Sequence, residues 1–181
     1  MHEELIRLCL KNDRKAQKEV YENLFGRMHA VCLRYLKDPD DALEVLNNGF
    51  LSVFTNIKQY GFKGSFEGWV KRIMINKSLD HLRANKRFST TDAVDDEYAF
   101  RHVSVDNEAW SNLGLEVLDG MIAQLPPMSR SVFNLYVIDG YSHHEIANIL
   151  SINPGTSRWH LSYARQSLQK MVKKTLHSSY A

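Results

Sequence analysis

The sequence predicts an all-α fold: two small helical domains joined by an acidic linker, the second ending in a helix-turn-helix. Apolar residues recur at helical spacing through most of the 181 residues. No pair of alternating apolar segments is joined by a hairpin turn. Residues 89–112 are polar, acidic and poor in periodicity, as expected of a linker. We therefore expect domains at residues 1–88 and 113–176, with residues 89–112 between them.

In the first domain, apolar residues at helical spacing predict helices over residues 3–10, 14–36, 39–59 and 66–87. Asp38 can cap the third of these helices, because Pro39 then takes the first helical position, where its missing N–H costs nothing. The apolar stripe of this helix predicts an inward face, which consists of Leu43, Leu46, Phe50, Val53 or Phe54, and Ile57.

A loop over residues 59–65, with two glycines and two aromatic residues, precedes the fourth helix, and Ser65 can cap that helix. Aromatic rings beside a basic helix suit single-stranded nucleic acid, because bases stack on rings while cations follow phosphates. For Phe66 and Trp69, each taken alone, packing in the core is the favoured interpretation.

The second domain shows helical patterns over residues 113–125 and 128–139, separated by Pro126-Pro127 and closed by Gly140. Ser142 and Glu145 then form a capping box that starts a short helix. Asn153 can cap a further helix that has Pro154 at its first position.

The last of these helices carries polar and basic residues in its first three turns, while its inward face continues through Leu161, Ala164 and Leu168. A short helix, a turn and such a second helix are typical of a helix-turn-helix, whose second helix enters the DNA major groove. An ordinary helical hairpin fits the same pattern.

The formal net charge is +2, so only its distribution is informative. Residues 60–88 hold seven Lys or Arg against two acids, and residues 154–174 hold five against none. Residues 89–120, between them, hold eight acids against one Arg. Two basic segments that flank an acidic one favour two contacts with a polyanion, although a basic stretch also suits a solvated helix face.

Several classes of protein are disfavoured. No apolar run approaches the ~18 residues of a membrane helix, and the charged, amphipathic N-terminus is not a signal peptide. Cys9 and Cys32 lack metal-ligand spacing, which indicates buried, reduced thiols in a cytoplasmic protein. His143 and His144 are adjacent on a helix, so their side chains diverge and are expected in solvent rather than on a metal. We expect no enzyme, catalytic residue, cofactor or metal.

The segment QLPPMSRSVFNLYVIDGYSHHEIANILSINPGTSRWHLSYARQSLQ resembles the C-terminal promoter-binding domain of bacterial sigma factors. The segment DDALEVLNNGFLSVFTNIKQYGFKGSFEGWVKRIMINKSLDHLRANKR is similar to their second region. Together they resemble the extracytoplasmic-function (ECF) group, which keeps only those two domains and a linker. The match covers nearly the whole chain in order and spacing.

This resemblance implies a non-catalytic subunit that binds RNA polymerase core and directs it to promoters. The partners it implies are the β-prime clamp helices and the β flap of the core, promoter DNA, and an anti-sigma factor that covers these surfaces. No membrane insertion is implied. The clamp-binding residues carried over are Asp41, Glu44, Val45, Asn47, Asn48 and Phe50.

The resemblance also implies two DNA-binding sets. At the −10 element one base is flipped from the duplex into a pocket, at a cost of a few kcal/mol. The residues implied there are Tyr60, Phe62, Lys63, Ser65, Trp69, Lys71, Arg72, Asn76, Lys77, Asp80 and Arg83. At the −35 element the implied residues are Thr156, Ser157, Arg158, Trp159, His160, Ser162 and Arg165. His81 and His160 are expected to face phosphate, and the linker to follow the RNA exit path.

The clamp-binding surface departs from the family pattern. The family usually shows an aspartate, a glutamine and an acidic residue where this chain has Glu44, Asn47 and Asn48, so charge and reach are reduced. Gly49 stands where a small helix former is usual, at a cost of ~0.5–1 kcal/mol in a helix interior.

The helix-turn-helix departs at two positions. Ser151 stands where the turn usually has glycine, so a non-glycine residue is expected in the left-handed conformation. Trp159 is bulky where a small polar residue is common. Two other hypotheses remain: a degenerate sigma-like interaction protein that acts through another partner, and a stand-alone helix-turn-helix regulator that binds duplex DNA tightly by itself.

Overall fold

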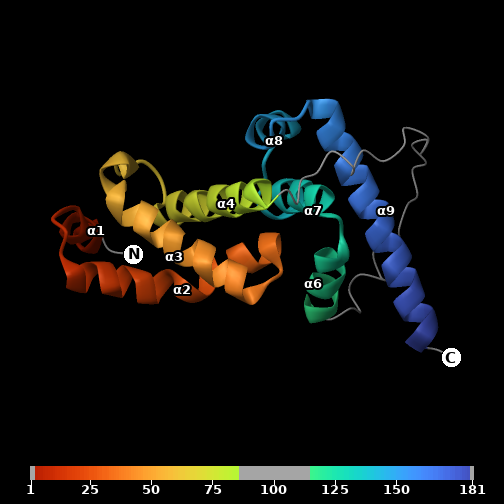
Figure 1. The fold of residues 1–181 in the computed structure, drawn as a ribbon, viewed down its shortest axis with the longest axis horizontal. Helices are drawn as coiled ribbons and strands as arrows, with labels where there is room; N and C mark the ends of the chain where they lie inside the picture. Colours follow the sequence, from red (N-terminus) through yellow and green to blue (C-terminus); the bar gives the residue numbers. More distant parts are fainter. Residues whose placement is uncertain (1–2, 86–114, 180–181) are drawn as a thin grey trace. The chain divides into compact units, whose positions relative to one another are not determined.

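The computed structural model describes residues 3–85 and 115–179, and within these ranges it contains helices and turns but no strand (Figure 1). The predicted all-α class is confirmed. The chain divides into two compact units, Met1–Asn85 and Lys86–Ala181. The acidic linker predicted at residues 89–112 lies outside the described residues.

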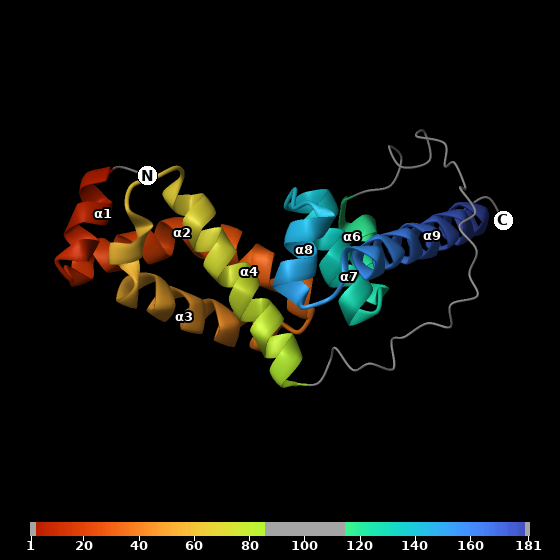
Figure 2. The same cartoon turned by 90° about the horizontal axis from the view of Figure 1, so that it is seen from above.

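Unit 1 contains α1 (Glu3–Leu10), α2 (Arg14–Leu36), α3 (Pro39–Thr55), the short 3₁₀ helix η1 (Ile57–Tyr60) and α4 (Phe66–Ala84). Helices α2, α3 and α4 pack against one another, and α1 packs on α2. Figure 2 shows α4 running across this layer. The third helix was predicted to reach residue 59, but it ends at Thr55, and the chain continues through Asn56 into the 3₁₀ helix η1.

The predicted caps of unit 1 are confirmed. The Asp38 carboxylate accepts from the amides of Asp40 and Asp41, at 2.9 and 3.1 Å. The Ser65 hydroxyl accepts from the Gly68 amide at 3.3 Å. These side chains satisfy backbone donors that a helix N-terminus otherwise leaves unpaired, so the start of each helix is set by its own sequence.

The core of unit 1 lies between α2, α3 and α4 and includes Val20, Leu24, Leu46, Val53 and Leu79. Leu43, predicted on the inward face of α3, is instead 41% exposed. The buried stripe of α3 runs through Ala42, Val45, Leu46, Gly49 and Phe50, and Leu43 falls just beyond its edge.

Gly49 of α3 faces the side chain of Met74 on α4. A Cβ atom at this position would lie far closer to Met74 Sδ than van der Waals contact allows, and 2.9 Å from its Cε. The Met74 side chain is fully buried, so it has little room to withdraw. Gly49 therefore provides the space that a core methionine of α4 occupies.

Unit 2 contains α6 (Leu115–Gln124), α7 (Pro127–Phe133), the π-helical turn η3 (Asn134–Ile138), α8 (His143–Leu150) and α9 (Pro154–Ser179). Its hydrophobic cluster joins Met121, Ile122 and Leu125 to Ala164, Leu168 and Val172 of α9. Figure 1 shows α9 as the longest helix, with α8 beside its N-terminal end. No helix in the described parts of the chain combines the length and apolar character needed to cross a bilayer.

We predict that Gly49→Ala destabilises the protein by about 1 kcal/mol, because overpacking costs ~1–3 kcal/mol and exceeds the ~1 kcal/mol gain in helix propensity. Gly26 of α2 is the matched control, since a Cβ there meets nothing within 4 Å. Gly26→Ala is expected to stabilise by ~0.5–1 kcal/mol. Urea denaturation followed by circular dichroism measures both. Equal stabilisation by the two substitutions would contradict the packing argument.

Candidate functional site

The helix-turn-helix of unit 2 is built by local hydrogen bonds. The predicted capping box is present: the Ser142 amide donates to Glu145 Oε2 at 2.8 Å, and the Glu145 amide donates to Ser142 Oγ at 3.3 Å. The Thr156 amide donates to Asn153 Oδ1 at 2.7 Å, which confirms Asn153 as the cap of α9. Ser151 lies in the left-handed region, with φ 57° and ψ 42°, as its position at the turn predicts.

Two of the residues predicted to contact the −35 element face inward. Ser157 is 0% exposed and its Oγ lies 2.9 Å from His143 Nδ1 of α8. His160 is 6% exposed and its Nδ1 lies 2.9 Å from Ser129 Oγ of α7. The predicted direct contact of these two side chains with DNA is therefore wrong. Both lie on the side of α9 that packs on α7 and α8, where they hold the helix in place.

Burial lowers the pKa of His160 to about 4. The pKa of His143 is also lowered, first by burial and then by the charges of Arg158, Arg165 and His144. His143 is half-buried, with its ring stacked on Tyr136 at 4.5 Å, so only His144 of this pair is exposed as expected. At neutral pH both pKa shifts favour the uncharged imidazole.

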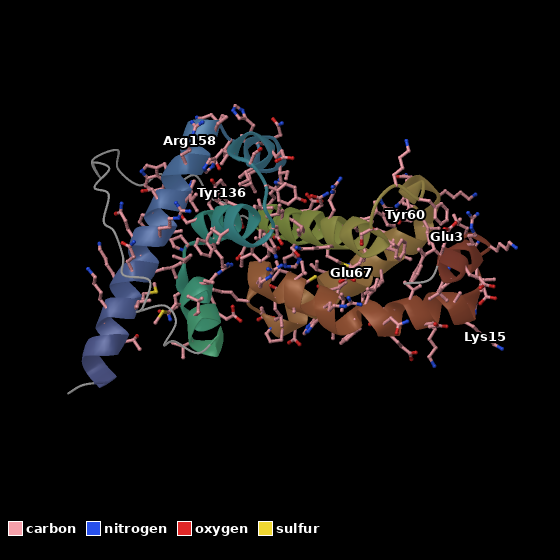
Figure 3. The ribbon with its side chains drawn as sticks, turned by 180° about the vertical axis from the view of Figure 1, so that it is seen from behind. Glu3, Lys15, Tyr60, Glu67, Tyr136 and Arg158 are labelled. Atoms are coloured by element: carbon pink, nitrogen blue, oxygen red, sulfur yellow. The ribbon has the colours of Figure 1, made fainter. Side chains whose placement is uncertain are left out.

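The remaining −35 candidates keep surface on the outer side of α9. Arg158 and Arg165 are exposed and lie seven residues apart, on the same side of the helix. The Arg165 guanidinium lies 5.9 Å from the centre of the Tyr136 ring. Thr156, Trp159 and Ser162 are partly exposed. Figure 3 shows Arg158 near the end of α9 that meets α8. This exposed surface is basic.

The −10 candidates include an aromatic cluster around Tyr60. Tyr60 is buried, its hydroxyl donates to the Gly64 carbonyl at 2.6 Å, and its ring centre lies 5.1 Å from Phe66 and 5.7 Å from Trp69. Tyr60 and Phe66 thus belong to the core, which corrects the surface role expected of Tyr60. Trp69 is partly exposed.

Phe62 is the exposed aromatic residue of this loop. Its φ is +56°, and the Arg7 guanidinium of α1 lies 4.7 Å from the centre of its ring. Lys63 and Ser65 are exposed beside it, although the Ser65 hydroxyl caps α4. The cation–π contact with Arg7 stabilises the left-handed backbone conformation of Phe62.

The exposed face of α4 carries Arg72, Asn76, Asp80 and Arg83, and Arg83 pairs with Asp80 at 2.6 Å. Lys71 and Lys77 are only partly exposed, because they flank the buried stripe. His81, expected to face phosphate, instead lies 3.4 Å from Asp41 Oδ1 on α3 and 2.8 Å from the Asn85 side chain. That expectation is wrong, because the ring faces its own unit.

A pocket of about 500 Å³ lies between α1, α2 and the loop, and sequence reasoning missed it. Its lining includes Glu3, Ile6, Tyr60, Phe62 and Phe66. At its edge Arg27 of α2 pairs with Glu67 of α4 at 2.6 Å. Figure 3 labels Glu3, Tyr60 and Glu67 around this end of the unit. Since the lining comes from separate elements, no linear motif marks the pocket.

The clamp-binding candidates on α3 divide by exposure. Glu44, Asn47 and Asn48 are exposed and Asp41 is partly exposed. Val45 and Phe50 are buried in the core of unit 1, so the contact predicted for these two side chains is wrong. The Tyr21 hydroxyl donates to Asn47 Oδ1 at 3.0 Å, which orients that amide.

Sequence reasoning missed two apolar residues on the same outer face. Leu43 and Leu51 are 41% and 67% exposed, and they lie on either side of Asn47 at four-residue spacing. Leu43 was predicted on the inward stripe, and Leu51 was assigned to no surface. Leu43 and Leu51 therefore add apolar area to an otherwise polar face of α3.

Comparisons with known proteins match both units. The family models "Sigma-70 region 2" and "Sigma-70, region 4" match residues 20–88 and 115–168. The ECF RNA polymerase sigma factor SigE of Mycolicibacterium smegmatis is 31% identical over 84% of this chain, which spans 59% of that protein's length. SigW of Bacillus subtilis is 25% identical, with 93% of this chain and 95% of SigW covered.

Solved structures match the fold. The sigma factor RpoE of Bartonella quintana, in complex with the anti-sigma factor NepR, has a TM-score of 0.55 at 18% identity, covering 86% of this chain and 96% of that one. CnrH, in complex with the cytosolic domain of CnrY, has a TM-score of 0.53 at 18% identity, covering 94% and 96%.

We predict that unit 2 loses stability as the pH falls from 6.5 towards 4. In that window an unfolded histidine binds a proton that buried His160 does not, so protonation favours the unfolded state by up to about 3 kcal/mol. Urea midpoints at several pH values measure the effect. His160→Gln, which keeps a hydrogen-bonding side chain beside Ser129, should flatten the dependence. An identical dependence in this variant would assign it to other groups.

Proposed function

The chain belongs to the ECF group of the sigma-70 family, and we propose that it binds RNA polymerase core and directs it to specific promoters. One observation carries the proposal: both family regions are present in order, and the helix-turn-helix of the second presents Arg158 and Arg165 to solvent. The protein then acts as a regulatory subunit without catalysis of its own, in the cytoplasm where the polymerase works.

The −35 element is read by the exposed side of α9 in this proposal. Arg158 and Arg165 supply charge for base edges and phosphates, and Thr156 and Ser162 supply shorter polar contacts. Ser157 and His160 act behind this surface, as residues that position α9 against α7 and α8.

The −10 element is held by the loop and the exposed face of α4. Phe62 offers a ring for stacking, and Lys63, Arg72 and Arg83 offer charge along the strand. The Asn76 side-chain amide can both donate and accept hydrogen bonds, so it suits a base edge. Ser65, Trp69, Lys71, Lys77 and Asp80 lie around this surface and complete the proposed contact set.

The polymerase core docks on the outer face of α3. The proposed contacts are Asp41, Glu44, Asn47 and Asn48, extended by Leu43 and Leu51. The leucines offset the reduced charge of the two asparagines, because apolar area buried at the interface contributes about 25 cal/mol per Å². The clamp helices are the proposed partner here, and the β flap is the proposed partner of unit 2.

An anti-sigma factor is the further proposed partner, because RpoE and CnrH were each solved in complex with another protein, in the first case one described as an anti-sigma factor. The proposed domains are residues 1–88 and 113–176, with the linker at 89–112, which is supported by the separate matches of regions 2 and 4.

Run-off transcription with purified core on a randomised promoter library tests the function. Specific transcripts that require both core and this protein are expected. Tight duplex binding by the protein alone would favour the stand-alone regulator. Failure of core to co-purify at moderate salt would favour the degenerate interaction protein, which the neutral Asn47 and Asn48 motivate.

We predict that Arg158→Ala removes the preference for the selected −35 sequence while use of the −10 element is retained, because a base contact by arginine is worth ~1–3 kcal/mol of discrimination. Transcription from promoters mutated in one element at a time measures this. Lys170→Ala, which removes an exposed cation further along α9, should leave the preference unchanged. A retained −35 preference in Arg158→Ala would mean that α9 is misassigned.

We also predict that Glu44→Lys weakens binding to core about tenfold, roughly 1.4 kcal/mol, because it reverses a charge at the proposed contact. Glu4→Lys makes the same change at an exposed site on α1 and serves as the control. Fluorescence titration of labelled protein with core gives both affinities. Equal affinities for the two variants would exclude this face of α3 from the interface.

A further inference from the structure

The outward side of α9 is centred on Trp159. The buried side of the helix consists of Ser157, His160, Leu161, Ala164 and Leu168. Opposite it, at i, i+4, i+7 and i+11 spacing, lie Gly155, Trp159, Ser162 and Gln166. The other three members of this row are small or uncharged, so the indole is the largest and most apolar group that the row presents.

The Trp159 ring is held in place within the free protein. It stacks on Tyr163, one turn further along α9, with ring centres 5.5 Å apart and planes 19° from parallel. Its edge meets His160 at 4.8 Å, and His160 is itself fixed by Ser129. Because the ring is ordered before any partner binds, contact with it costs little side-chain entropy.

The charged groups lie to one side of this row. Arg158 and Arg165 share a neighbouring strip of α9, where their long side chains can reach phosphates or a base edge beside the helix. The centre of the face is therefore left to Trp159, whose one polar atom is a single N–H donor.

The chemistry of the major groove limits what an apolar ring at this place can read. Each base pair presents donors and acceptors there, and its apolar feature is the C5-methyl group of thymine. A ring placed against any other base edge would leave that edge's polar atoms without water or partner, at a cost of ~1–3 kcal/mol each.

We propose that Trp159 is a specificity-determining residue, which selects a thymine in the −35 element by contact with its C5-methyl group. This proposal rests on the proposed promoter-binding function of α9. The indole then distinguishes thymine from other bases independently of the arginine contacts. The preferred −35 sequence is therefore expected to contain a thymine whose methyl group contributes to binding affinity.

Deletion of single methyl groups from the DNA tests this. The preferred −35 element is first selected from a randomised library with core and the wild-type chain. Each thymine of that element, on either strand, is then replaced by deoxyuridine, and holoenzyme affinity for each template is measured. One replacement is expected to weaken binding about fourfold, the factor that burial of one methyl-sized group is worth.

Two variants assign the effect to Trp159. Trp159→Ala should bind the unmodified promoter more weakly and lose the sensitivity to deoxyuridine, whereas Trp159→Phe should keep most of it. Thermal unfolding of both variants checks that α9 remains folded. If the alanine variant unfolds, Trp159→Gln, which keeps a long side chain without the apolar ring, replaces it and should likewise lose the sensitivity.

An element without thymine, an absence of any deoxyuridine effect, or the same effect in Trp159→Ala would each overturn the proposal while promoter-specific transcription persists. Failure to select any promoter with core would instead remove the proposed function, and the proposal with it.

Discussion

The surface of unit 2 depends on how the chain reverses direction within three residues between α8 and α9. Ser151 takes a left-handed conformation that costs a non-glycine residue ~1–2 kcal/mol. The Ile152 amide donates to the Ala147 carbonyl at 3.0 Å, and the Asn153 cap contributes ~1 kcal/mol in return. Because the turn is this short, α9 begins at once and its outward face is available from the first turn.

Directional contacts then set the rotation of α9 about its own axis. Apolar burial is non-directional, so Leu161, Ala164 and Leu168 alone would tolerate small rotations. The hydrogen bonds of Ser157 to His143 and of His160 to Ser129 require particular geometries on two neighbouring helices. Polar residues on the inner face therefore decide which residues the outer face presents.

Apolar periodicity predicted the helices of both units. Residue type predicted most of their caps, because capping side chains act on backbone groups two or three residues away. It failed at the edges of helix faces. A stripe of apolar residues does not reveal its own width, so Leu43 was predicted inside. Val45 was placed on the surface by the family resemblance, although its side chain is buried. Ser157 and His160 were predicted on the surface because they are polar. A polar side chain can be buried when it has a hydrogen-bond partner, and the sequence does not show that partner. The pocket beside Phe62 combines residues of α1, α2, α4 and the loop, so no local pattern could reveal it.

The contact between Gly49 and Met74 also has a consequence for how sequences of this kind diverge. A residue larger than glycine at position 49 requires a shorter side chain at position 74, because both side chains occupy the same volume between α3 and α4. A substitution at only one of the two sites then leaves the space between the helices either overpacked or with a cavity. Across a set of relatives, the sizes of these two residues should vary inversely, and this covariation would be a record of helix packing rather than of promoter or partner choice.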